Sequence, residues 1–564
     1  MTAGTWWGDA NVTALPYGAH DNSSRIRDHL LASSPVADWA AIEREVIDGY
    51  FRFSPNHARA AGDHRFDGVV GDPSATTIQA RIEEIDRQLE RLERLDGLSP
   101  DRAADRQGLV VQLRTSRLEL AELRWPFAEP MFYTGFDSEL DVSTYLKRPY
   151  APLGERLKAL RQHLAGYSGY LEAARDNLEP SLPRPNLEIA IEAAAGQADY
   201  LQGEVRTAAA GDAETIRAVD RAVVETRAAV EFLKQRRRDA HDHFALGEER
   251  FMRLLQTREM VPLNVGELES LVRADIERNM AAAQRAADAT SPGRGVEAAL
   301  RDLEEHHPTT ETIIDDVRAT LEGLRRFILE RDLVSIPSET RCLVRPTPSY
   351  ASYISAAMDS AGPLETVATE SYYYVTVPAA DWSETSREQW LRHLNYAMLE
   401  NVSIHEAYPG HFVQSLHERQ VASRTRQLFW SYATVEGFAH YVEEMMLDAG
   451  YSTDPKLQLA QRSEALLRDC RFLVALGLHC HAMPMAEAIR LFMSVGFLSE
   501  LPAQREAMRG AWDPLYLSYT LGKLLILELR RDLEGRADYS LKRFHDAFLG
   551  CGYLPVPLIR QLIS

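Results

Sequence analysis

Apolar residues recur every three or four positions along most of the first 330 residues. The clearest stripe consists of Ile78, Ile82, Ile85, Leu89, Leu92 and Leu95. Charged residues stand between them, which is typical of an amphipathic helix that buries one face. The same pattern predicts helices over residues 101–124, 153–178, 186–209, 213–240, 265–289 and 309–330. We therefore expect a helical scaffold lobe at residues 41–330, preceded by an irregular N-terminal arm at residues 1–40, where this period is missing.

The pattern changes after residue 330, where prolines interrupt the chain as far as Pro378. The segment Tyr372–Val377 is rich in β-branched and aromatic residues and predicts a strand, which we place at the edge of a small sheet. Helical periodicity then returns and continues to the C-terminus. Residues 331–564 are thus expected to form a second lobe. The whole chain is expected to be mainly α, with a small β element and a central cleft between the lobes.

Composition argues against several classes of function. The 564 residues include 83 acidic and 63 basic side chains, which gives a formal net charge of −20. This charge would repel a phosphate backbone, so no nucleic-acid partner is expected. The four cysteines include no C-x-x-C pair and predict neither a disulfide framework nor a thiolate zinc site. Without a signal-peptide pattern at Met1–Asp9 or a run of about 18 apolar residues, we expect a cytoplasmic protein with no membrane partner.

Candidate chemistry is concentrated in the segment Ser403–Phe412. Glu406 directly follows His405, and His411 comes six positions after His405. In the shorter His-Glu-x-x-His motif of zinc peptidases, both imidazoles bind the ion and the glutamate polarises the attacking water. Six residues turn a straight helix through roughly 600°, which leaves the two side chains about 120° apart. A regular helix would therefore prevent the two histidines from sharing one metal ion.

Pro409 and Gly410 offer a way around this spacing. Proline lacks the N–H that continues a helix, and glycine accepts nearly any backbone dihedral angle. Together they predict a break that loops two residues out and returns His411 beside His405. A tetrahedral zinc site needs a third protein ligand, and Glu436, 25 residues after His411 on a second predicted helix, is the candidate.

These residues carry a resemblance to a known family. The pattern His-Glu-x-Tyr-Pro-Gly-His, followed by Glu-Gly-Phe-Ala, resembles the bacterial DUF885 family, which is placed with zinc peptidases of the Glu-zincin type. Weaker blocks in the family's order extend the resemblance over most of the chain. They lie at Pro55–Gly68, Arg468–Arg471, Gly477–His479, Ser518–Lys523, Leu529–Arg530 and Phe544–Pro555. The resemblance implies a helical zinc-peptidase-like body with one zinc ion (Zn2+) per chain, bound by His405, His411 and Glu436, with Glu406 as general base.

Three further residues each have more than one interpretation, and a fourth, Phe412, departs from the family's pattern. His440 stands where the family commonly has an aliphatic residue, and it could contact the ligands, replace one of them or lie on a helix surface. Phe412 stands where the family often has a second histidine. His479 and Tyr519 are candidate hydrogen-bond donors to a tetrahedral oxyanion, and core packing is the alternative role for both.

The arginines of the C-terminal blocks also have two interpretations. Arg468, Arg471 and Arg530 could bind the terminal carboxylate of a substrate, or they could form ion pairs in this acid-rich chain. The dipeptide His417-Glu418 has no histidine six positions later. It therefore shows that a His-Glu pair alone predicts no metal site.

The sequence predicts a zinc-dependent, metallopeptidase-like hydrolase that cleaves short peptides with a metal-activated water. Glu406 would take the proton of that water and return it to the leaving amine. One alternative is a metallohydrolase of non-peptide amides or esters. The other is a non-catalytic helical scaffold that binds a metal. A glutamate beside the first ligand favours catalysis, because a purely structural site needs no base.

Overall fold

The computed structural model describes residues 35–135, 138–348, 354–380 and 382–564. Most of the arm predicted at residues 1–40 lies outside these ranges. Its last residues, from Pro35 onward, belong to a helix and not to an irregular segment. Within the described ranges, no helix combines the length and the apolar character that crossing a membrane requires.

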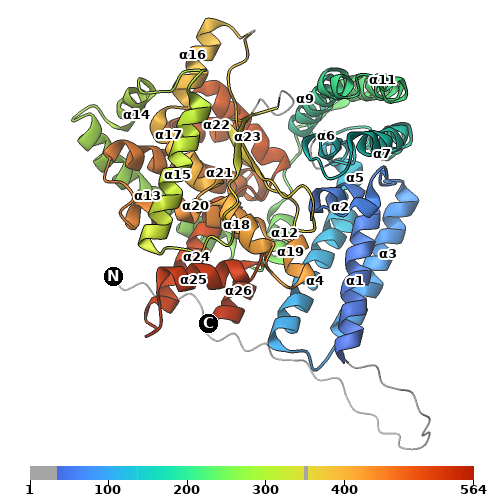
Figure 1. Cartoon of the computed structure of the whole chain (residues 1–564), viewed down its shortest axis with the longest axis horizontal. Coiled ribbons are helices and arrows are strands. Elements are labelled where there is room, and N and C mark those ends of the chain that lie inside the picture. The colour runs from blue at the N-terminus through green and yellow to red at the C-terminus, as the bar shows by residue number, and fades with distance from the viewer. Residues whose placement is uncertain (1–34, 136–137, 349–353, 381) are drawn as a thin grey trace, which may run out of the picture.

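The first part of the chain forms a group of helices on one side of the molecule (Figure 1). They are α1 (Pro35–Phe53), α2 (Pro55–Ala61), α3 (Ala75–Glu93), α4 (Pro100–Arg117), α5 (Trp125–Ala128), α6 (Thr144–Lys147), α7 (Leu153–Ala165), α8 (Tyr167–Asn177), α9 (Arg184–Tyr200), α10 (Arg206–Ala208) and α11 (Ala213–Arg236). Short π-helical segments continue α4 and α9. The stripes predicted at residues 78–95 and 213–240 are confirmed as α3 and α11, each of which buries its apolar face. The single helix predicted over residues 153–178 is divided into α7 and α8.

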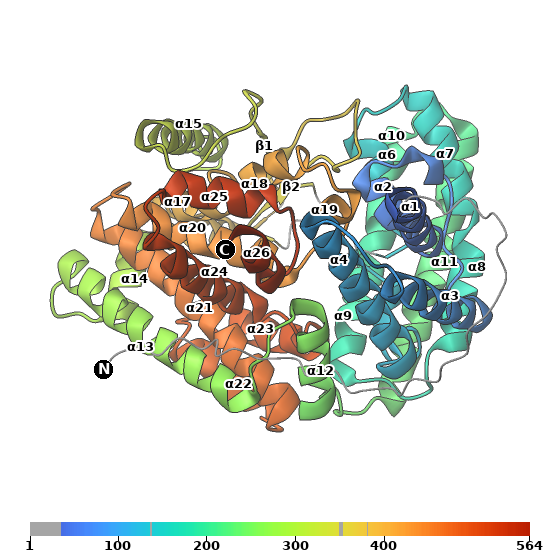
Figure 2. The same ribbon diagram turned by 90° about the horizontal axis from the view of Figure 1, so that it is seen from below.

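Most of the remaining helices lie on the other side, as two perpendicular views show (Figures 1 and 2). They are α12 (Glu248–Glu259), α13 (Val265–Thr290), α14 (Val296–Glu304), α15 (Ile313–Arg331), α16 (Glu384–His393), α17 (Tyr396–Glu406), α18 (His411–Glu418), α19 (Arg424–Leu428), α20 (Tyr432–Asp448), α21 (Pro455–Cys480), α22 (Met485–Ser494), α23 (Glu500–Trp512), α24 (Ser518–Glu534), α25 (Leu541–Gly550) and α26 (Val556–Ile563). The prediction of a mainly α fold with a small β element is confirmed.

The hydrophobic core does not divide the chain at residue 330. Leu254, Val272 and Leu324, from α12, α13 and α15, are fully buried in the same cluster as Ile404 of α17. Separate clusters hold most of the buried apolar residues of α1 to α11. Helices α12 to α15 therefore pack with the C-terminal half, although the helical pattern placed them in the scaffold lobe. The pattern shows that a helix has an apolar face but not which partner covers it.

The small sheet differs from the sequence prediction in its strand order. Its strands are β1 (Leu343–Pro346), β2 (Ala356–Asp359) and β3 (Tyr372–Val375), in the order β1-β3-β2. The predicted edge strand is thus the central one, parallel to β1 and antiparallel to β2. All four residues of β3 are buried, which explains its strand-forming, apolar composition. Within the described residues, β1 and β2 are the two edge strands, and each has one side without a strand partner.

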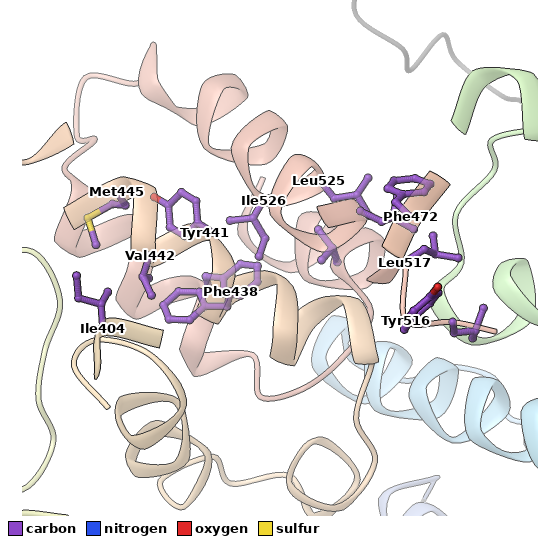
Figure 3. Close-up of a cluster of buried hydrophobic side chains, with 14 of the residues drawn as sticks. Ile404, Phe438, Tyr441, Val442, Met445, Phe472, Tyr516, Leu517, Leu525 and Ile526 are labelled. Carbon is purple, nitrogen blue, oxygen red and sulfur yellow. The ribbon is translucent and has the colours of Figure 1, made fainter. Parts of the chain in front are cut away.

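Helices α20 and α24 cross in close contact and form the centre of the C-terminal half. A Cβ atom added to Gly437 would lie 2.5 Å from the Cα of Gly522, so the crossing requires glycine on both helices. Figure 3 shows Phe438 and Tyr441 of α20 in one cluster with Ile526 of α24. Burying such side chains contributes about 1.5–3 kcal/mol each. The crossing places Glu436 and Tyr519, one position before Gly437 and three before Gly522, on neighbouring helices.

Candidate metal centre

A break between two helices brings His405 and His411 together. Helix α17 ends at Glu406 and α18 begins at His411, and the Tyr408–Pro409 peptide bond between them is cis. The Gly410 amide donates to the Ile404 carbonyl at 3.0 Å. A Cβ atom on Gly410 would lie 1.7 Å from the His405 carbonyl oxygen, so only glycine fits here. The interruption expected at Pro-Gly is present, and the two imidazole centroids lie 4.9 Å apart.

Glu436 completes a group of three potential ligands. Its Oε2 atom lies 3.5 Å from Nε2 of His405 and 3.5 Å from Nε2 of His411. Two ligand atoms of a tetrahedral zinc ion, each about 2.0–2.1 Å from the metal, are roughly 3.3–3.5 Å apart. Oε2 of Glu436 is buried and has no well-aligned hydrogen-bond partner. An unpaired buried carboxylate oxygen facing two imidazole nitrogens fits a bound divalent cation.

The other nitrogen of each imidazole has an oxygen partner. Nδ1 of His405 lies 2.7 Å from Oε1 of Glu443, and Nδ1 of His411 lies 2.9 Å from Oε1 of Gln414. With Nδ1–H donating to these oxygens, the lone pair of each Nε2 faces Glu436, which is the tautomer that a metal ligand needs. Sequence reasoning assigned no role to Glu443 or Gln414. The spacing in the sequence could have indicated Glu443, because this residue lies seven positions, about two turns, after Glu436 on the same helix.

The start of α20 is anchored, which fixes the position of Glu436. The side chain of Ser431 caps the helix by accepting from the Thr434 amide. Glu259 of α12 is buried and accepts hydrogen bonds from the Tyr432 amide at 3.0 Å and the Ala433 amide at 3.3 Å. Burial raises the pKa of Glu259. Two elements far apart in sequence therefore hold the first turn of the helix that presents Glu436.

The ligand group is electrostatically coupled. Burial opposes ionisation of Glu436, but the imidazoles of His411 and His405 hold its pKa well below its usual range. Burial likewise disfavours the charged form of His405, but the nearby carboxylates of Glu436 and Glu443 raise its pKa to about 9. These directions describe a protonated imidazole beside a carboxylate. A bound divalent cation would replace the proton as the positive charge in this group.

Glu406 lies beside the ligand group and against the sheet. Its Oε2 atom accepts a hydrogen bond of 2.8 Å from the Met358 amide, which points away from β3 at the free edge of β2. Its charge is close enough to help raise the pKa of His411, for which burial is the largest and opposing influence. The predicted general base is thus placed between the predicted ligands and a strand edge.

The two candidate oxyanion donors lie in different places. The ring of Tyr519 is 6.5 Å from the ring of His405 and nearly parallel to it, and Tyr432 lies 5.7 Å from Tyr519. His479 is a core residue, because its Nε2 donates to the Gly510 carbonyl and its Nδ1 accepts from the Leu246 amide. The sequence hypothesis for His479 is therefore wrong, since neither ring nitrogen is free to donate to a substrate. Tyr432 was missed.

His440 lies behind the ligand group. It is fully buried, which excludes a position on the helix surface. Its Nδ1 atom lies 3.4 Å from Oε2 of Glu443 without a well-aligned hydrogen bond. Burial, together with the charge of Lys523, lowers its pKa to about 3, so the ring is neutral. Within the described ranges, the group close enough to hold a metal consists of His405, His411 and Glu436 and does not include His440.

All three predicted arginines form ion pairs. Arg468 contacts Glu443 at 3.3 Å and Glu464 at 2.8 Å. Arg471 makes two hydrogen bonds with Glu506, at 2.8 and 2.7 Å, and Arg530 pairs with Glu534 at 2.9 Å. Only Arg468 and Arg471 lie beside the metal group, because both face the ring of Tyr519.

Comparisons with known proteins agree on the fold. A family model described as "Bacterial protein of unknown function (DUF885)" matches residues 55–563. A solved candidate lipoprotein of unknown function from Shewanella oneidensis is 24% identical, with a TM-score of 0.78 over 94% of this chain and 100% of its own. A second candidate lipoprotein, from Colwellia psychrerythraea, is 14% identical, with a TM-score of 0.79 over 93% of this chain and 98% of its own. A search of curated proteins found no match.

Proposed function

Because this chain belongs to the DUF885 family, a family of bacterial proteins of unknown function, we propose its activity from the site itself: a zinc-dependent hydrolase that cleaves short peptides. One observation carries the proposal. A buried carboxylate oxygen of Glu436 without a hydrogen-bond partner lies 3.5 Å from Nε2 of both His405 and His411. Two imidazoles and one carboxylate make up the protein ligands of one class of catalytic zinc site, in which a nearby second glutamate serves as the base.

His405, His411 and Glu436 would hold the ion. When bound, zinc polarises a substrate carbonyl and makes a water molecule more acidic. Glu406 accepts the proton of the attacking water and later transfers it to the leaving nitrogen. The Met358 amide orients the Glu406 carboxylate for both transfers through a 2.8 Å hydrogen bond. The hydroxyl of Tyr519 is a candidate donor to the oxyanion that develops on the carbonyl oxygen.

The free edge of β2 supports a peptide as the substrate. An extended peptide can form main-chain hydrogen bonds with a strand that lacks a neighbour on one side. β2 has only four residues, Ala356–Asp359, and its Met358 amide already contacts Glu406. A peptide paired with this edge would pass directly in front of the general base. The shortness of the strand favours short peptides over folded proteins.

Metal content and turnover test the proposal. Purified protein is expected to contain about one zinc per chain, which His405→Ala, His411→Ala and Glu436→Gln should lower. Glu406→Gln should retain zinc but lose cleavage of a short-peptide mixture read by mass spectrometry. His417→Ala is the matched control, because His417 also precedes a glutamate but binds the Ser335 carbonyl. Normal zinc content in both histidine ligand variants would refute the proposal.

A cytoplasmic location is a further part of the proposal. It rests on four cysteines that are all free thiols, three of them buried. The two solved relatives are named as candidate lipoproteins, which would place those proteins at a membrane. Fractionation of cells that produce the natural chain separates the two possibilities. Recovery in the envelope fraction would contradict the cytoplasmic assignment.

A further inference from the structure

Three arginines surround the aromatic ring next to the metal group. The guanidinium carbons of Arg468, Arg471 and Arg509 lie 5.8, 5.1 and 5.8 Å from the ring centroid of Tyr519. The same ring stacks at 6.5 Å on His405, one of the three potential ligands. Helices α21 and α23 thus bring three guanidinium groups to the ring that α24 places beside the metal group. We refer to Arg468, Arg471 and Arg509 as the arginine cluster.

Carboxylates hold the arginine cluster in place. Arg471 uses Nε and Nη2 to bind Glu506, and the described residues provide no acceptor for its Nη1. Arg509 uses Nε and Nη2 to bind Asp513, and its Nη2 also donates to the hydroxyl of Tyr432 at 2.9 Å. In Arg471 and Arg509, the edge formed by Nε and Nη2 binds a carboxylate, which fixes the orientation of the guanidinium as in a preorganised binding site.

Arg468 provides an unsatisfied donor in the same place. It is only 6% exposed, and its Nε atom is buried without a hydrogen-bond partner, although Nη1 and Nη2 contact Glu464 and Glu443. A buried guanidinium N–H without an acceptor costs free energy unless a ligand or water satisfies it. Arg471, Arg509 and Tyr519 are partly exposed, whereas Arg468 is buried.

The polar groups on the two sides of the metal group differ, and this difference would orient a bound peptide. Glu406, which binds the Met358 amide of β2, repels an anion. Beside Tyr519, by contrast, Nε of Arg468 and Nη1 of Arg471 are N–H donors for which the described residues provide no acceptor, although carboxylates pair with each guanidinium. A residue of extended peptide spans at most about 3.6 Å. The C-terminal carboxylate of a short segment beyond the cleaved bond therefore reaches the cluster while the bond itself lies at the metal group.

We propose that the arginine cluster binds the free C-terminal carboxylate of the substrate, so that the enzyme releases a short C-terminal piece from a peptide. This inference rests on the proposed hydrolase function and names its substrate class. The reaction remains a hydrolysis: the C–N bond breaks, the carbonyl carbon gains the OH of water, and the leaving nitrogen gains the proton. The arginines bind and position the carboxylate and take no part in proton transfer.

Paired substrates test the inference. N-acetylated tripeptides with a free C-terminus should be cleaved about 10- to 100-fold faster, in kcat/KM, than the same peptides with a C-terminal amide, because hydrogen bonds to charged groups contribute about 1.5–3 kcal/mol. Arg471→Gln and Arg509→Gln should reduce that preference to within a few-fold, because they slow cleavage of the acid more than cleavage of the amide. Equal cleavage of acid and amide by the wild-type enzyme would overturn the inference and leave the hydrolase intact.

A control variant on the same helix separates binding from folding. Arg462 of α21 is also paired, with Glu444 at 3.0 Å and Asn279 at 3.1 Å, but it does not contact Tyr519. Arg462→Gln should keep the preference for the acid. Because Arg471→Gln leaves Glu506 unpaired, the double variant Arg471→Gln/Glu506→Gln serves as a second test without a lone buried charge. A preference retained in this double variant and in Arg509→Gln would refute the inference.

Binding provides a measurement that does not depend on turnover. In calorimetry with full-length protein stripped of metal by a chelator, N-acetyl-leucine should bind about 10-fold or more tightly than its amide. Arg471→Gln should abolish the difference and Arg462→Gln should not. Equal binding of acid and amide would reject the carboxylate site. Failure of the proposed hydrolase function would appear differently: no peptide, acid or amide, would be cleaved, even if zinc content falls in the ligand variants as expected.

Discussion

Nδ1 of His405 lies 2.7 Å from Oε1 of Glu443, two helical turns after the glutamate whose oxygen faces Nε2 of the same ring. One helix, α20, therefore contacts both nitrogens of one imidazole. Glu443 is fully buried and also contacts Arg468 at 3.3 Å and Asn401 at 3.3 Å. Such a carboxylate sets the tautomer and orientation of a ligand histidine. Glu443 is thus a positioning residue for His405.

Glu443→Gln is expected to weaken zinc binding by about 10- to 100-fold, the usual effect of removing a carboxylate partner of a ligand histidine. Competition with a chromophoric chelator measures this affinity. Glu444→Gln is the matched control, because the neighbouring Glu444 pairs with Arg278 and Arg462 instead. Equal affinities in the two variants would contradict the positioning role.

Gly410→Ala is expected to disrupt the turn between the two histidines. The new Cβ would lie 1.7 Å from the His405 carbonyl oxygen, so the backbone must shift, at a cost of about 1–3 kcal/mol. Urea denaturation measures the loss of stability, and zinc content measures the displacement of His411. Gly196→Ala is the control, because Gly196 lies exposed in α9 with open space around its Cβ position. It should be neutral or stabilising by about 0.5–1 kcal/mol.

Tyr519→Phe is expected to lower kcat about 100-fold while zinc content stays normal, because the variant loses one donor to the developing oxyanion. Steady-state kinetics on a cleaved peptide checks this effect. Tyr516→Phe is the control: the Tyr516 hydroxyl is buried without a partner near the start of the same helix. Its removal should leave kcat unchanged. A Tyr519→Phe variant with wild-type kcat would return Tyr519 to a packing role.

Because His479 is buried as a neutral imidazole, we expect the free energy of unfolding to decrease in acid. Burial lowers its pKa to about 4, below the value of about 6.5 in an unfolded chain. Between these values the unfolded chain binds a proton that the folded chain does not, so stability falls as pH falls from about 6.5 to 4, by up to about 3 kcal/mol. His479→Gln should flatten this part of the curve of unfolding free energy against pH. The exposed His243→Gln is the control, and an equal slope in both variants would contradict the assignment.

The sequence by itself determined the helices and the candidate ligands. Apolar stripes predicted α3, α11 and α13 nearly to their ends, because helical periodicity is a local property of the chain. The spacing of His405 and His411 across Pro-Gly likewise predicted a break, since the steric properties of those two residues are local as well.

Only the tertiary structure decided which groups meet. It made β3 a central strand, paired Arg471 with Glu506, enclosed His479 in the core and gathered three arginines around Tyr519. The identity of a hydrogen-bond or ion-pair partner depends on contacts between segments far apart in sequence. An apolar stripe or a charged side chain shows that a partner is needed, but the packing of whole helices selects it.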